Sequence, residues 1–206
     1  KKMEVEVKLR IPDLANFDRL KALLAPSHLK TLTQKNYFFD TATSALSSRR
    51  AVLRIRLVSS SASVAAAAFV TLKGNARLVG GVSRVEEDEE EIDATVGEAC
   101  LADPARLGSI GSRVVGRCKE EYGAAEFLCL GGFDNVREVY GWRRGLKLEV
   151  DETRFAFGSC YEVECESEDP DRVKAELEGL FRENGVEFRN SEMSKFAIFR
   201  SGKLPE

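Results

Sequence analysis

The chain has 206 residues, the length of one ordinary domain or of a domain with a long insertion. Hydrophobic residues make up 43% and charged residues 32%, which is too apolar for a disordered chain and rich in charge for a globular domain. The 31 Lys and Arg residues nearly balance the 34 Asp and Glu residues, which excludes the basic excess expected of a general nucleic-acid binder. The arrangement of the two signs along the chain therefore has to carry the functional information.

The lack of long apolar runs, the cysteines and the single histidine exclude several classes of protein. No run of roughly 18 apolar residues and no signal peptide is present, so we expect a cytoplasmic protein without a membrane partner. We expect a single domain over residues 3–206, with Lys1 and Lys2 added ahead of a natural start at Met3. The five cysteines lack CxxC spacing, which favours free thiols. His28 is the only histidine, which excludes a histidine-based triad or a multi-histidine metal site.

The first third of the chain predicts strands around one helix. Charged and apolar residues alternate with period two from Glu4 to Ile11, a strand pattern. Leu and Phe then recur at helical spacing until Pro26, which predicts a helix over residues 14–24. Three more strands are predicted over residues 29–40, 51–58 and 69–73, with a mobile Ser- and Ala-rich loop over residues 59–67.

The densest charged run, residues 82–92, predicts a strand whose two faces are both acidic. By parity with Arg84, we expect Glu86, Asp88 and Glu90 to face inward and Glu87, Glu89 and Glu91 to be solvated. The rest of the chain predicts a helical stretch over residues 103–123, strands over 127–130, 133–142, 146–152 and 159–166, a helix over 172–184 and a short helix or turn over 191–196.

Full charges, rather than Ser, Thr, Asn and Gln, occupy the polar faces of these strands. Period two places the charges of each strand on one side of the sheet. In one geometry the apolar faces form the core and the charges point to water. In the other, a sheet of about eight strands closes with its charges inside, where one small ligand fits. The signs favour the closed sheet, because some strands are acidic and others are basic.

Acidic and basic strands together predict a particular ligand. Carboxylate oxygens are the ligands that Mg²⁺ and Mn²⁺ prefer, and Mg²⁺ commonly binds through a few carboxylates and substrate phosphates. Arg and Lys donate hydrogen bonds to phosphate oxygens. A closed sheet lined by both sets therefore suits a metal-chelated polyphosphate.

The segment Glu4-Val5-Glu6-Val7-Lys8 resembles the ExExK signature of the CYTH superfamily, the triphosphate tunnel metalloenzymes. The resemblance spans nearly the whole chain, and the plant single-domain members are the most similar. It implies an α+β, mainly β fold, an eight-stranded antiparallel closed tunnel with a charged lumen and helices packed outside. It also implies hydrolysis of inorganic triphosphate to diphosphate and phosphate by a metal-activated water. Later matching segments begin at Tyr37, Leu53, Leu72, Arg84, Lys147, Tyr161 and Ser194.

The same resemblance implies the site residues and the cofactor, Mg²⁺ or Mn²⁺. Lys8 and Lys195 match catalytic positions. Glu162 shares the parity of the last acidic pair, so the register of that pair stays open. The implied metal ligands are Glu4, Glu6, Glu149, Asp151, Glu164 and Glu166. The implied phosphate-binding residues are Lys8, Arg10, Arg54, Arg56, Lys73, Arg84, Arg137 and Lys195.

Three alternatives share these motifs. An adenylate cyclase that converts ATP to cAMP would need the same metals and phosphate contacts, and so would a thiamine or nucleoside triphosphatase. A non-catalytic polyphosphate-binding module would need mainly the basic set, so the acidic set argues against it. We expect a monomer whose partner is a small-molecule triphosphate, because a closed sheet has no free edge to cover.

Overall fold

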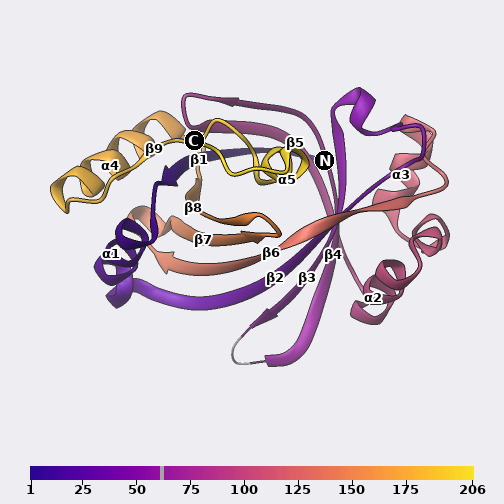
Figure 1. Cartoon of the computed structure of the whole chain (residues 1–206), viewed down its shortest axis with the longest axis horizontal. Helices are drawn as coiled ribbons and strands as arrows, with labels where there is room; N and C mark the ends of the chain where they lie inside the picture. The colour runs from indigo at the N-terminus through magenta and orange to yellow at the C-terminus, as the bar shows by residue number, and fades with distance from the viewer. Residues whose placement is uncertain (61–62) are drawn as a thin grey trace. The chain divides into compact units, whose positions relative to one another are not determined.

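The structure, a computed structural model, describes residues 1–60 and 63–206, with the backbone alone for residues 63–66 (Figure 1). It divides into two compact units, which we describe separately. The first unit comprises Lys1–Met3, Gln34–Ala76 and Val85–Phe133, and the second comprises Glu4–Thr33, Arg77–Arg84 and Asp134–Glu206. None of the described helices has the length and apolar character needed to span a membrane.

The strands pair in the order β5-β4-β3-β2-β6-β7-β8-β1-β9, and β5 also pairs with β1. That extra pairing closes eight strands on themselves and leaves β9 as an addition beside β1, so the predicted closed antiparallel sheet is confirmed. The strands are β1 (Lys2–Ile11), β2 (His28–Asp40), β3 (Ala51–Ser60), β4 (Ser63–Val79), β5 (Val82–Ile92), β6 (Leu128–Gly141), β7 (Lys147–Phe155), β8 (Gly158–Glu166) and β9 (Arg189–Asn190).

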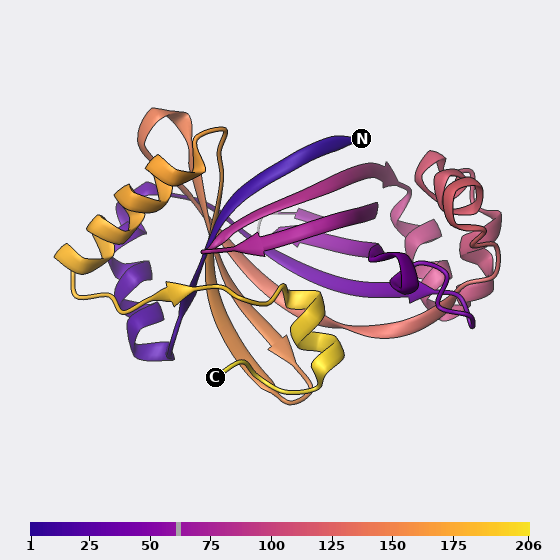
Figure 2. The same cartoon turned by 90° about the horizontal axis from the view of Figure 1, so that it is seen from above.

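Two helices cover the apolar strand face of the second unit. Helices α1 (Leu14–Leu24) and α4 (Pro170–Glu183) lie side by side (Figure 2). Asp13 and Asp169 cap their N-termini by accepting backbone hydrogen bonds. The helices pack on alternate residues of β1, β7 and β8, including Leu9, Val150 and Val163, and all three are buried. The charged residues of these strands therefore occupy the opposite face.

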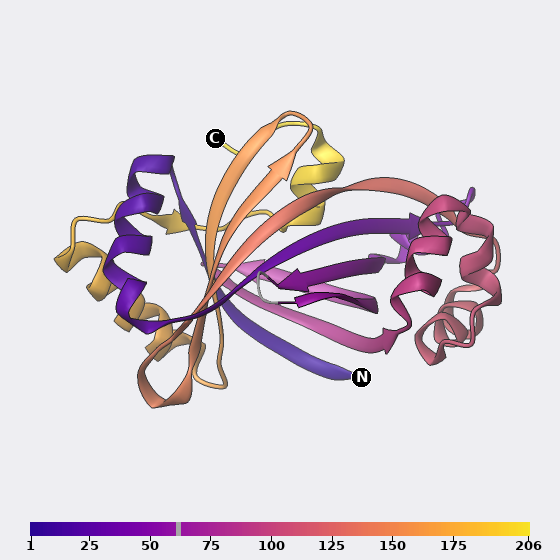
Figure 3. The same ribbon diagram turned by 90° about the horizontal axis from the view of Figure 1, so that it is seen from below.

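In the first unit, two other helices likewise cover the apolar face of the strands. Helices α2 (Ala94–Ala102) and α3 (Arg113–Tyr122) lie together (Figure 3) and bury the apolar face of β3 and β4. The prediction of one helical stretch from residue 103 was wrong, because α2 precedes it and η3 (Pro104–Ser109) interrupts it. Helix α3 begins only after Ser112, which caps it, and ends at Gly123 in the left-handed conformation (φ 66°).

Two segments predicted to break the sheet continue it. Residues 59–60 and 63–67 of the predicted loop belong to β3 and β4, and residues 61–62 lie outside the described residues. Pairing of Val58 with Ala67 supplies hydrogen bonds that outweigh the poor strand propensity of Ala. Strand β6 runs unbroken through Gly131 and Gly132. A Cβ on Gly132 would lie 1.8 Å from the Asn36 carbonyl oxygen, so only glycine allows this close approach to β2.

The C-terminal segment forms α5 (Lys195–Ser201), with Ser194 as its N-cap, so the helix begins near the end of the stretch 191–196 that was predicted to be a helix or turn. This helix lies beside the hairpin of β7 and β8 (Figures 2 and 3), where Leu204 meets Gly158. All five cysteines are free thiols, as the sequence predicted.

Candidate active site

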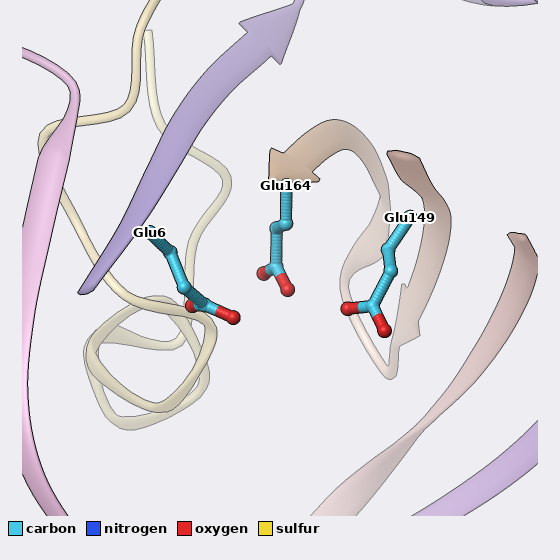
Figure 4. Close-up of side chains that lie close together, drawn as sticks. All are labelled: Glu6, Glu149 and Glu164. Carbon is cyan, nitrogen blue, oxygen red and sulfur yellow. The ribbon is translucent and has the colours of Figure 1, made fainter. Parts of the chain in front are cut away.

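Three carboxylates converge in the second unit. Glu6 on β1, Glu149 on β7 and Glu164 on β8 each place one oxygen within 4.8 Å of the others. Figure 4 shows the three carboxyl groups directed into the same space from different strands. Glu6 and Glu164 are buried and Glu149 is half-buried. Hard oxygen donors at this spacing fit a divalent cation such as Mg²⁺ or Mn²⁺.

Strand register brings these residues together. Strand β8 lies between β1 and β7 and is antiparallel to both. Glu164 is opposite Lys8 on one side and opposite Glu149 on the other, and Glu6 is opposite Glu166. Directly opposite residues share a face of the sheet, so the four acids and Lys8 all lie on the face away from α1 and α4.

Three cations surround the Glu164 carboxylate. Its Oε1 is 2.7 Å from Lys8 Nζ and also contacts Lys195 Nζ. Its Oε2 accepts a hydrogen bond of 2.8 Å from Arg137 Nη2. Lys8 and Arg137 reach the other two members of the cluster as well: Lys8 Nζ is 3.4 Å from Glu6 Oε2, and Arg137 Nη1 contacts Glu149 Oε2.

Asp151 and Glu162 extend this network away from the three-carboxylate cluster. Asp151 has no solvent exposure and accepts two hydrogen bonds from Arg137, at 2.8 Å and 2.7 Å. Its Oδ2 also lies 2.9 Å from Lys195 Nζ. Glu162 is equally buried and accepts hydrogen bonds from Lys195 at 2.7 Å and Ser191 at 2.5 Å. Both carboxylates therefore orient basic groups that also reach Glu164.

The network shifts the pKa values of its members. Burial raises the pKa of Glu164, but Lys195, Lys8 and Arg137 together hold it well below its ordinary value. Burial likewise opposes ionisation of Asp151, yet Arg137 and Lys195 lower its pKa to about 2. Burial raises the pKa of Glu149 despite the nearby Arg137. The surrounding acids outweigh burial at Lys195 and raise its pKa, so the ammonium stays charged at neutral pH.

These shifts predict acid sensitivity. A carboxyl group whose pKa is lower in the folded than in the unfolded chain stabilises the fold. This stabilisation is complete at pH values above the unfolded pKa, about 3.9 for Asp, and it is lost as pH falls through the folded pKa. For Asp151 this window runs from about 4 down to about 2. We therefore expect the thermal midpoint, followed by circular dichroism, to fall below pH 4. The fall should persist in 1 M salt, because buried pairs are screened weakly. A midpoint unchanged down to pH 2.5 would contradict this assignment.

The first unit carries three of the other predicted basic residues, Arg54, Arg56 and Lys73. Arg54 is opposite Thr71 across β3 and β4 and donates to its hydroxyl at 3.0 Å. Lys73 lies 2.9 Å from Glu87, and Arg54 lies 3.5 Å from Glu89. These basic side chains share one strand face with two acids of the charged run.

Arg56 follows Arg54 by two residues in β3, so the two side chains lie on the same face of the strand. Its Nε donates a hydrogen bond of 2.8 Å to the side-chain oxygen of Asn36 on β2. Asn36 is buried, so this contact forms largely out of water.

The inward and outward assignment of the charged run was therefore wrong. Asp88, expected to face inward, is buried beside α3, where it pairs with Arg113 and Arg117 at 2.7 Å each. Glu90 accepts a hydrogen bond of 2.7 Å from Ser112 at the start of α3. Docking of a basic helix gives these acids partners, and parity then leaves Glu87 and Glu89 on the face of Lys73 and Arg54.

The predicted residues separate into groups by position. Arg10 joins the second-unit network through Glu162, at 3.4 Å. Glu4 and Glu166 lie outside the three-carboxylate cluster, and Glu166 is exposed. Arg84 is also exposed and shares the strand parity of Asp88.

Sequence reasoning missed several polar groups beside the predicted residues. Glu162 had been noted only as an ambiguity of register, although its parity with Glu164 was the available signal. The residues that contact Arg54, Arg56 and Lys73 belong to no recognisable motif, because the sequence of a strand does not show which side chains of neighbouring strands its polar residues contact. These partner residues are Asn36, Thr71, Glu87 and Glu89.

Comparisons with known proteins agree with this architecture. A family model described as the CYTH domain matches residues 2–196. HpAC1 from Hippeastrum, named as an adenylyl cyclase and described as having a dominant triphosphatase activity, is 48% identical. The match covers 98% of this chain and 97% of that one, with a TM-score of 0.93. The curated proteins contain no match.

More distant structures share the fold alone. A Bacillus halodurans protein named as an adenylate cyclase is 17% identical over 97% of this chain and 98% of its own, with a TM-score of 0.69. PH1819 from Pyrococcus horikoshii is 19% identical over 96% and 99%, with a TM-score of 0.62. The match of the family model to nearly the whole chain and the 48% identity to HpAC1 show that this chain belongs to the CYTH domain family.

Proposed function

We propose that this protein hydrolyses inorganic triphosphate to diphosphate and phosphate with the help of Mg²⁺ or Mn²⁺. The observation that carries the proposal is the convergence of Glu6, Glu149 and Glu164 beside Lys8, Lys195 and Arg137. The triphosphatase activity described for HpAC1, at 48% identity, supports the same reaction. Binding of polyphosphate alone would need only the basic residues.

The carboxylate cluster fits a metal ion by its chemistry. All its donors are oxygens, as Mg²⁺ and Mn²⁺ prefer, and their mutual distances allow one ion to contact all three. A bound divalent ion would supply charge neutralisation and activation of water for attack on phosphorus. Glu4 and Glu166, on the same strands, remain proposed contributors to this acidic site.

The basic residues supply the remaining chemistry. Hydrolysis of a phosphoanhydride needs positioning and neutralisation of a highly charged substrate more than it needs a protein nucleophile. We assign Lys8, Lys195 and Arg137 to the reacting phosphate, because their cationic groups surround the carboxylate cluster. The hydrogen-bonded networks that hold them limit the reorganisation needed during the reaction. We assign a further phosphate to Arg10, which reaches Glu162 in the same network. Arg54, Arg56 and Lys73 remain proposed phosphate-binding residues of the first unit.

The assembly and compartment are proposals of the same kind. We propose a functional monomer that acts on a small-molecule triphosphate, because the eight strands that close on themselves leave few free edges to cover. The five free thiols suit a reducing compartment such as the cytoplasm.

One purified sample tests the function. We expect phosphate release from tripolyphosphate with Mg²⁺ or Mn²⁺, and a loss of at least about 100-fold in excess EDTA. ATP and thiamine triphosphate should be poorer substrates, because the proposed residues bind phosphate groups alone and none is assigned to bind the adenosine or thiamine part. Colorimetric phosphate determination, with cAMP measured by chromatography, separates the alternatives. Formation of cAMP from ATP without hydrolysis of tripolyphosphate would overturn the proposal.

A further inference from the structure

The amino group of Lys195 contacts Glu164, one of the three carboxylates that the cluster offers to a metal. Lys195 Nζ contacts Glu164 Oε1 and lies 2.9 Å from Asp151 Oδ2 and 2.7 Å from Glu162 Oε1. Its side chain is 13% exposed, so these contacts form largely out of water. The carboxylates neutralise the ammonium, but one of them belongs to the three-carboxylate cluster.

The charge balance of the network leaves little attraction for a free dication. With all groups ionised, five carboxylates face four cations, which leaves a net charge of −1. A metal bound to the cluster would lie close to the positive groups that contact the same carboxylates, a repulsion strengthened by burial. The carboxylates are Glu6, Glu149, Asp151, Glu162 and Glu164, and the cations are Lys8, Arg10, Arg137 and Lys195.

We propose that the Lys195 ammonium and the metal ion compete for Glu164. A bound triphosphate relieves this competition, because its oxygens accept the hydrogen bonds that the ammonium otherwise donates to Glu164. Lys195 begins the short helix α5 near the C-terminus, and its long side chain can exchange one anionic partner for another. A phosphate oxygen is a suitable new partner. The inference deepens the proposed function, on which it rests.

This competition makes metal and substrate binding cooperative. Whatever frees Glu164 from the ammonium strengthens metal binding, and by linkage the metal strengthens triphosphate binding by the same factor. Removing the ammonium should therefore have opposite effects on the two ligands. The metal should bind more tightly because its competitor is gone, and triphosphate should bind more weakly because it loses a cationic partner. Damage to the fold would weaken both.

The experiment measures binding in Lys195→Met. Free Mn²⁺ is followed by electron paramagnetic resonance without phosphate, and tripolyphosphate binding is followed by calorimetry in EDTA, where metal-dependent hydrolysis is suppressed. Close charge pairs commonly couple by about 1.5 kcal/mol or more, so we expect Mn²⁺ to bind at least about ten-fold tighter and tripolyphosphate about ten-fold weaker. Lys203→Met, with the same charge change at an exposed position nearby, should match the wild type.

The outcomes separate the two proposals. Mn²⁺ binding to Lys195→Met that equals or is weaker than wild type overturns the competition, even if the wild type is an active triphosphatase. An inactive wild type overturns the proposed function, while the two binding comparisons still decide the role of Lys195. Equal tightening in Lys203→Met would assign the effect to overall charge and overturn the inference. Lys195→Gln replaces the methionine variant if that variant does not fold, and Lys195→Arg should retain the wild-type metal affinity.

Discussion

Glu164→Gln is expected to lower metal-dependent triphosphatase activity by at least about 100-fold, more than removal of a group that merely orients a metal ligand. Glutamine keeps the size of the side chain but removes the negative charge that Lys8, Lys195 and Arg137 share. It offers a metal only one neutral oxygen. Phosphate release from tripolyphosphate at saturating Mn²⁺ measures the effect.

Two comparisons make this result specific. Glu168→Gln changes an exposed acid four residues later and should retain wild-type activity. Glu166→Gln should cost less than Glu164→Gln, because Glu166 is exposed and lies outside the carboxylate cluster. This comparison also resolves the register that the sequence left open. A Glu164→Gln enzyme that is folded by circular dichroism and retains a tenth of wild-type activity would show that Glu164 does not hold the metal.

Asp151→Asn is expected to cause a large loss of stability. Asp151 is fully buried, accepts both hydrogen bonds from Arg137 and pairs with Lys195. The asparagine amide would present a donor to the Arg137 guanidinium and leave two buried cations undercompensated. Breaking a buried pair in this way costs about 3–5 kcal/mol of unfolding free energy, and the thermal midpoint should fall by roughly 10 °C.

The neighbouring residue supplies a matched control. Glu152 follows Asp151 on β7 but points to the other face, where it pairs with the exposed Arg154 at 3.1 Å. Exposed ion pairs contribute little, so Glu152→Gln should change unfolding free energy by less than about 1 kcal/mol. Thermal and urea unfolding of both variants tests the contrast. Equal losses in the two variants would mean that the Arg137–Asp151 pair does not stabilise the buried network.

Periodicity predicted the elements that have a regular pattern of their own. The alternation in β1 and the amphipathic helices α1 and α4 were predicted because each pattern records which face meets the core. The segments that were wrong depend on distant partners. The Ala-rich residues 63–67 become strand because β3 pairs with them, and β6 passes through Gly131 and Gly132 because β2 approaches closely there.

The acidic run shows the same limit at the level of side chains. Strand parity established that Glu86, Asp88 and Glu90 share a face and that Glu87 and Glu89 share the other. It gave no sign of which face α3 would cover. Arg113 and Arg117 decide this by pairing with Asp88, and they lie 25 and 29 residues later in the chain. The orientation of β5 is thus set by a helix whose docking no local pattern encodes.

The alternation of acidic and basic strands already favoured, by sequence alone, a closed sheet and predicted a polyphosphate ligand. The resemblance of the segment from Glu4 to Lys8 to the ExExK signature indicated the family to which the chain belongs. Only the tertiary structure decided which acids meet. Register across β1, β8 and β7 brings Glu6, Glu149 and Glu164 together and leaves Glu166 exposed. Lys195 reaches Glu164 from a helix near the end of the chain. Period two determines the face of a strand on which a residue lies, but strand pairing and burial determine its neighbours and therefore its chemistry.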